Sequence, residues 1–149
     1  SYHRENIFNE LVNIRSRISQ AKSLNPWDAK IGPGRLQDID LLSQAGCLIH
    51  RSLSRSTADG LEALVFGNFI TQKEFSEIKA AVSQLWSWQI GLNILFKGRA
   101  ELENMNVLEN EAKVEIFEKQ TLTEVKNSLH HLSNKINKVI NKILSHEKG

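Results

Sequence analysis

The feature that most constrains the fold is the spacing of apolar residues near the C-terminus. Hydrophobic side chains recur there in steps of three and four, at Leu122, Val125, Leu129, Leu132, Ile136, Val139 and Ile143. This spacing places them on one face of an α-helix. A second stretch, from Ile7 through Ile18, has the same period. The chain is therefore predicted to build its core from helices.

Similar patterns predict the remaining elements. The expected helices cover residues 4–22, 35–53, a short segment from 57, a long one from 71 to 96, a shorter one near 108–119, and the final helix. Thr57 is expected to cap the third helix, and Thr71 with Glu74 has the spacing of a capping box. Residues 23–34 hold both prolines and two glycines and predict a loop.

The predicted fold class follows from these elements. No stretch shows a convincing alternation with the period of two that marks a half-buried strand. We therefore predict an all-α fold, a bundle of five or six helices. With 149 residues, the chain is expected to form a single domain, residues 1–149.

Composition and charge limit the classes of partner and the compartment that we expect. A net charge of +2 is too mild to indicate a nucleic-acid partner. No apolar run approaches the length of a membrane span, and the N-terminus lacks the layout of a signal peptide. The single cysteine cannot form an internal disulfide, which favours a reducing compartment. We expect a cytoplasmic protein without a membrane or nucleic-acid partner.

The stretch KIGPGRLQDIDLLSQAG, residues 30–46, contains two aspartates one residue apart. On a strand, Asp38 and Asp40 would share a face and could hold one divalent ion. On a helix they point about 200° apart. Because the following leucines have helical spacing, a shared metal site is rejected. Cys47 and His50 are spaced to face each other, but two ligands do not make a zinc site.

The two aspartates are predicted to have different roles. Asp38 falls within the apolar arc, so it needs a partner, and Lys30 or Arg15 could supply the counter-charge. It either pins the loop onto the helix or orients the glycine loop for a partner domain or ligand. The opposite side carries a polar strip that is either solvated or a docking surface, made of Gln37, Asp40 and Gln44.

Other polar and aromatic residues have alternative interpretations. Trp86 lies on the apolar arc of the fourth helix and is expected in the core, with Trp88 nearer the edge. Gln89 and Asn93 either satisfy each other or a loop, or mark a surface that meets another domain. The lysines of the last helix either line a solvated face, which is the commoner outcome, or bind a nucleic acid or an acidic partner.

The loop and the helix after it resemble a known family. The order lysine, x, glycine, x, glycine, x, leucine, x, aspartate, isoleucine, acid, three residues, glutamine is similar to that of glutamine-synthetase adenylyltransferases and PII-protein uridylyltransferases. The match falls on Lys30, Gly32, Gly34, Leu36, Asp38, Ile39, Asp40 and Gln44. The resemblance extends over residues 5–96, and Arg35 departs from it where the family usually has a glycine.

In this family a helical domain follows a nucleotidyltransferase domain. The resemblance therefore implies a helical domain from a larger adenylyltransferase-like enzyme of nitrogen regulation. It would pack on the nucleotidyltransferase domain and help recognise glutamine synthetase or the PII protein. Such an enzyme uses ATP and Mg²⁺ bound by strand-borne carboxylates beside a Gly-Ser turn. This chain has neither the Gly-Ser dipeptide nor a predicted strand.

We therefore expect no cofactor, metal site or catalytic residue in this chain, and no activity from the chain alone. The candidate interdomain or binding residues are Lys30, Gly32, Gly34, Arg35, Asp38, Asp40 and Gln44. The alternative is a free-standing helical interaction module that has kept the scaffold without the enzyme.

Overall fold

The fold is all-α, as predicted from the hydrophobic spacing. The computed structural model describes residues 4–20, 25–51, 56–96, 113–114 and 117–148. Five helices lie in these ranges: α1 (Arg4–Gln20), α2 (Leu36–Ile49), α3 (Thr57–Phe66), α4 (Gln72–Leu95) and α7 (Leu122–Lys148).

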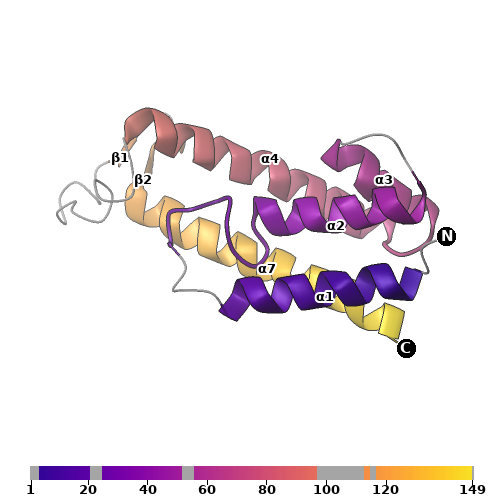
Figure 1. Cartoon of the computed structure of the whole chain (residues 1–149). Coiled ribbons are helices and arrows are strands. Elements are labelled where there is room, and N and C mark those ends of the chain that lie inside the picture. The colour runs from indigo at the N-terminus through magenta and orange to yellow at the C-terminus, as the bar shows by residue number, and fades with distance from the viewer. Residues whose placement is uncertain (1–3, 21–24, 52–55, 97–112, 115–116, 149) are drawn as a thin grey trace.

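The helices form a bundle with α1 and α7 side by side and α4 along the opposite edge (Figure 1). α2 contacts α1, α3 and α4, and α7 contacts both α1 and α4. One continuous core joins them, and its largest fully buried apolar side chains are Ile39, Leu42, Leu61, Leu64, Ile78, Leu85, Val125, Leu129, Ile136 and Ile140. This burial supplies most of the stabilisation.

The helix starts follow capping chemistry. The predicted capping box at the start of α4 is confirmed, with reciprocal hydrogen bonds between Thr71 and Glu74. α7 begins in the same way, since Thr121 and Glu124 exchange bonds of 3.1 and 3.2 Å. The expected cap of α3 was wrong by one residue. Ser56, rather than its neighbour Thr57, accepts from the backbone N–H of Asp59.

Two predicted boundaries also differ. α2 ends at Ile49 rather than near residue 53, because His50 caps it and Arg51 has a positive φ of 52°. A helix was expected near 108–119, but residues 113–114 (β1) pair in antiparallel fashion with residues 120–121 (β2). Glu118 and Lys119 both have positive φ, which an α-helix does not allow. Residues 108–112 and 115–116 of that expected helix lie outside the described residues.

The prediction that Trp86 is in the core was wrong. Trp86 is 48% exposed, whereas Trp88 is 5% exposed and belongs to the core. Gly91 explains why the Trp88 side of α4 faces the core, since a Cβ at Gly91 would overlap the ring of Phe117. The Phe117 ring packs directly on the backbone of α4 beside Trp88, so this side of the helix faces inward.

Candidate functional site

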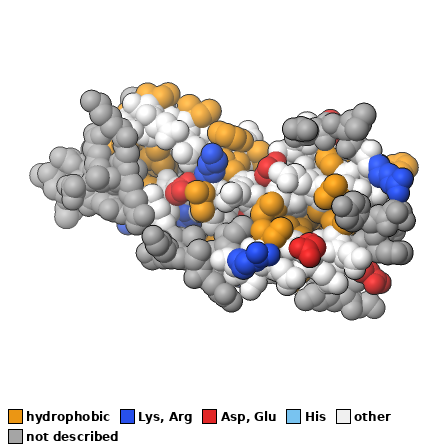
Figure 2. Space-filling view, viewed as in Figure 1, with side chains coloured by type: hydrophobic (Ala, Val, Ile, Leu, Met, Phe, Trp, Pro, Cys, Tyr) orange, Lys and Arg blue, Asp and Glu red, His pale blue; other side chains and the backbone are white. Residues whose placement is uncertain are grey.

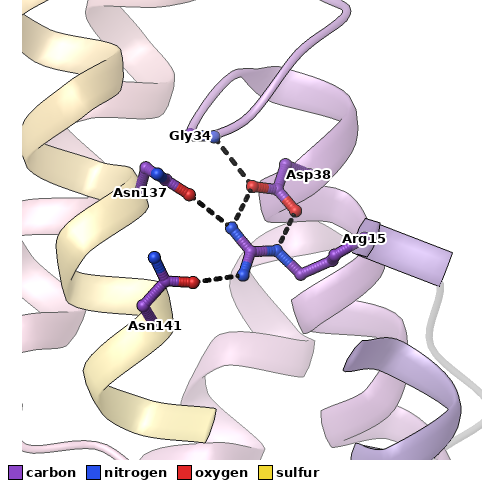
Figure 3. A network of polar contacts seen from close by, with 5 residues as sticks. All are labelled: Arg15, Gly34, Asp38, Asn137 and Asn141. Carbon is purple, nitrogen blue, oxygen red and sulfur yellow. Dashed lines mark hydrogen bonds and ion pairs between the residues drawn. The ribbon is translucent and has the colours of Figure 1, made fainter. Parts of the chain in front are cut away.

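The candidate site is centred on Asp38 in the first turn of α2. Asp38 is 3% exposed, as its place on the apolar arc predicted. Its carboxylate oxygens accept from Arg15 Nε at 2.7 Å and Nη2 at 2.9 Å, and from the backbone N–H of Gly34 at 2.7 Å (Figure 3). Of the two proposed counter-charges, Arg15 is therefore the partner, and Lys30 is exposed. Two donors from the paired guanidinium and one backbone N–H offset the cost of burying this anion.

Arg15 extends the network to the far end of the chain. Its Nη1 donates to Asn141 Oδ1 and its Nη2 to Asn137 Oδ1, both at 2.7 Å (Figure 3). One guanidinium on α1 therefore joins α2 and α7. The carboxylate of Asp38 adds the loop between α1 and α2 through Gly34.

Gly34 brings the loop into direct backbone contact with α7. It has a positive φ of 72°. A Cβ at this position would overlap the carbonyl oxygen of Ser133 and lie 2.8 Å from the amide nitrogen of Asn137. Both the conformation and the space therefore require glycine. Gly32 also has a positive φ, of 136°, so both glycines of the signature serve the geometry of the loop.

Arg35 is buried at the point where the loop enters α2. Its Nη1 donates to the backbone carbonyl of Asn25 at 2.7 Å and to that of Asp28. Burial lowers the pKa of the Arg35 guanidinium, and the nearby charge of Asp28 partly opposes this. Its Nε has no hydrogen-bond partner. Arg35 therefore holds the first part of the loop by its carbonyls, a role that the sequence pattern did not indicate.

The loop also covers the amino end of α2. The backbone N–H groups of Leu36 and Gln37 donate to the carbonyls of Ala29 and Lys30 at 3.1 and 2.8 Å. A helix amino end with free N–H groups can bind an anion, but here the loop occupies these donors. The N–H of Ala29 donates in turn to Gln89 Oε1 at 3.2 Å, and Gln89 donates to Asn93 at 3.3 Å. The prediction that Gln89 and Asn93 satisfy each other or a loop is therefore confirmed.

Asp40 lies on the other side of α2 from Asp38, as helical geometry predicts. It accepts from Gln44 Nε2 at 2.8 Å and from Thr57 Oγ1 at 3.3 Å. Gln44 is exposed and also borders an apolar groove of about 490 Å³ between α1 and α2. Gln37 is exposed as well, so the predicted polar strip is accessible.

The aspartates do not fit a magnesium–nucleotide site. The oxygens of Asp38 face Arg15 and Gly34, whereas those of Asp40 accept from Thr57 on α3 and from Gln44 on α2. Across the described ranges, no three His, Cys, Asp or Glu side chains gather closely enough to hold a metal ion. The same ranges contain no helix with the length and hydropathy to cross a membrane.

Two contributors to this site were missed from the sequence: Asn137 and Asn141. The two asparagines are four residues apart, on the edge of the apolar stripe of α7. Polar side chains at that spacing lie on one helix face, so a pair of amides beside a core stripe was a usable signal. Arg35 was a candidate from the sequence, but its inward role on the loop carbonyls had no signal, since a lone arginine after a glycine usually extends into solvent.

Together these features define a class of domain: an all-helical bundle that clamps a glycine loop between α2 and α7 by a buried ion pair. Comparison with known sequences then assigns the family. The family model described as GlnD PII-uridylyltransferase matches residues 6–102. The chain belongs to this family of nucleotidyltransferases. The matched range includes Arg15, Gly34 and Asp38 and ends before Asn137 and Asn141.

A curated relative agrees with this family. The bifunctional uridylyltransferase/uridylyl-removing enzyme of Methylococcus capsulatus (strain ATCC 33009 / NCIMB 11132 / Bath) is 40% identical over 81 residues. The aligned part covers 54% of this chain but 8% of the relative, so the chain spans a small part of that enzyme. No solved structure matches the chain.

Proposed function

We infer that this chain is the non-catalytic helical domain of a nucleotidyltransferase that modifies a protein of nitrogen regulation. The domain packs on the nucleotidyltransferase domain of the enzyme and helps it to recognise the protein substrate, glutamine synthetase or PII. Family membership supports the enzyme class. The mild charge and the lone Cys47 favour a cytoplasmic setting.

The observation that carries this proposal is the rigid mounting of the glycine loop. Asp38 holds the loop from α2 and Gly34 rests on α7, so the loop backbone is fixed from two sides. On this support Lys30 and Ile31 are exposed to solvent. A fixed backbone presenting exposed side chains loses little entropy on binding, which favours recognition of a partner surface.

Nucleotidyl transfer is assigned to the rest of the enzyme. ATP and Mg²⁺ are expected at strand-borne carboxylates of the catalytic domain, as in adenylyltransferases of this family, and we derive no catalytic step on this chain. Asp38 and Asp40 are engaged in separate hydrogen bonds on opposite sides of α2. The proposed role of this domain is therefore positioning and recognition.

A labelling assay tests the assignment of catalysis. The chain is incubated with Mg²⁺ and ATP or UTP labelled at the α-phosphate, together with purified glutamine synthetase or PII. We expect no label on either protein. Transfer by the chain alone would refute the non-catalytic role. The sequence upstream in the gene gives a second test, because a start codon adjacent to Ser1 would favour the free-standing module.

A binding measurement tests recognition. Calorimetric titration of the chain with glutamine synthetase and with PII should show binding to one of them, weakened at least about tenfold by Lys30→Glu. The matched control is Lys73→Glu, an exposed lysine on α4 outside the loop. Equal loss in both variants would point to overall charge, and no binding to either protein would count against recognition by this domain.

A further inference from the structure

α4 exposes apolar side chains on the side away from the core. Trp86, Ile90 and Ile94 are 48%, 53% and 66% exposed. They are spaced by four residues, so they form one stripe, which we call the outer stripe. Trp88 and Leu92 on the same helix are buried. Figure 2 shows hydrophobic side chains gathered along the edge of the molecule where α4 runs.

The outer stripe lies in a segment without charge. From Ala80 to Phe96 the chain contains no Lys, Arg, Asp or Glu. A surface helix ordinarily carries charged residues on its solvent face, and a helix that is apolar on both faces is usually covered. Depletion of charge with enrichment of tryptophan is also the composition of an interface core. The polar residues at exposed positions beside the stripe are neutral: Ser83, Gln84, Ser87 and Asn93.

We propose that the outer stripe pairs with the same stripe of a second copy of this chain. A two-fold interface places one patch against itself, so the patch must be self-complementary. A neutral apolar stripe meets this condition, because no like charges are brought together. A strongly charged partner would instead lose hydration against a surface that offers no counter-charge.

The spacing of the stripe suggests how the two helices meet. In an antiparallel pair centred on Ile90, Trp86 of one copy faces Ile94 of the other. These residues span eight positions, about 12 Å along the helix. The nearest charged residue before the stripe, Lys79, then lies outside this central contact.

The area that the outer stripe could bury indicates a weak dimer. The exposed face of the whole uncharged segment from Ala80 to Phe96, which includes Trp86, contributes roughly 400–500 Å² per copy. The total of roughly 800–1,000 Å² lies below the approximately 1,200 Å² of stable complexes. An interface of this size is typical of weak association, and we expect a dissociation constant on the order of 10–500 μM. The inference does not depend on the nucleotidyltransferase assignment.

Sedimentation equilibrium over about 5–500 μM measures this pairing. The average mass should rise from the monomer value of 16.9 kDa toward twice that value. Because the contact is apolar, the dissociation constant should change less than about twofold between low and high salt. A monomer at every concentration overturns the proposal and would mean that the outer stripe contacts a surface other than a second copy of this chain. Dissociation by salt also overturns it.

Matched variants locate the contact. Ile90→Glu should weaken pairing at least about tenfold, since it places two like charges near the two-fold axis. The control is Leu48→Glu, because Leu48 is 52% exposed and lies on α2, away from the outer stripe. It should leave the dissociation constant within about twofold. Mixing Ile90→Glu with Ile90→Lys should restore a dimer, since opposite charges then meet across the axis.

The outcomes separate clearly. Pairing that survives Ile90→Glu, or that Leu48→Glu weakens equally, overturns the proposed contact. Failure of the mixed variants to associate overturns the antiparallel arrangement centred on Ile90. Circular dichroism of each variant should match the parent chain, because both substituted side chains are on the surface.

Discussion

Replacing Asp38 by alanine should destabilise the domain by about 3 kcal/mol. The substitution removes the acceptor of three hydrogen bonds, two from Arg15 and one from the backbone N–H of Gly34. A buried N–H left without a partner costs about 1–3 kcal/mol, and charge-assisted bonds contribute about 1.5–3 kcal/mol each. Arg15 retains Asn137 and Asn141, which limits the loss.

Replacing the partner of Asp38, Arg15, by alanine should cost more. In Arg15→Ala the carboxylate of Asp38 stays buried with Gly34 as its remaining donor. A buried charge that loses its partner costs about 3–5 kcal/mol. The double variant removes both the charge and its partner, so its cost should fall about 2 kcal/mol short of the sum of the single substitutions.

Urea unfolding followed by circular dichroism measures these free energies. At this chain length, 3 kcal/mol corresponds to a fall in Tm of about 6–12 °C. The control is Asp40→Ala, an aspartate of the same helix, which should cost less than about 1 kcal/mol because Asp40 is less buried. Hydrogen exchange adds a local readout, since the amide of Gly34 should exchange faster in Asp38→Ala alone. Equal effects at the two aspartates, or additive costs in the double variant, would refute the buried ion pair.

Three further predictions follow from the packing. Gly34→Ala should cost about 2–4 kcal/mol in urea unfolding, since its positive φ and the backbone of α7 leave no room for a methyl group. Trp88→Ala should cost about 3–5 kcal/mol and Trp86→Ala less than about 1 kcal/mol, and the opposite order would contradict the assigned face of α4. Burial, with the nearby carboxylates, raises the pKa of the Cys47 thiol. Its alkylation by iodoacetamide should therefore reach half-maximal rate above pH of about 8.5. Because the folded chain then holds its proton more tightly than the unfolded one, the contribution of this thiol to stability is lost as pH rises through the raised pKa.

Periodicity and capping patterns predicted most of the helices and one central contact, the ion pair between Arg15 and Asp38. Asp38 lies on the apolar face of its helix, so the sequence required a counter-charge and named Arg15 as a candidate. The same helical rotation separated Asp38 from Asp40. These inferences succeeded because they depend on neighbours within one helix and on the cost of a buried charge.

The errors arose where tertiary packing decides between local alternatives. α4 has apolar residues on both faces, so period alone could not choose between Trp86 and Trp88. The contact of Phe117 with Gly91 makes the choice, and it joins residues far apart in the sequence. The strand pair at 113–114 and 120–121 is too short to show a period.

Arg35 shows how the loop is held despite a departure from the family pattern. Its φ of −102° is extended backbone, so this position does not require glycine. The arginine side chain turns back to bind the carbonyls of Asn25 and Asp28, which lie near the start of the loop. Gly34 keeps its positive φ and its contact with α7. The second glycine of the family can thus be replaced here because the backbone demand falls on Gly32 and Gly34, and the added side chain fastens the loop at its other end.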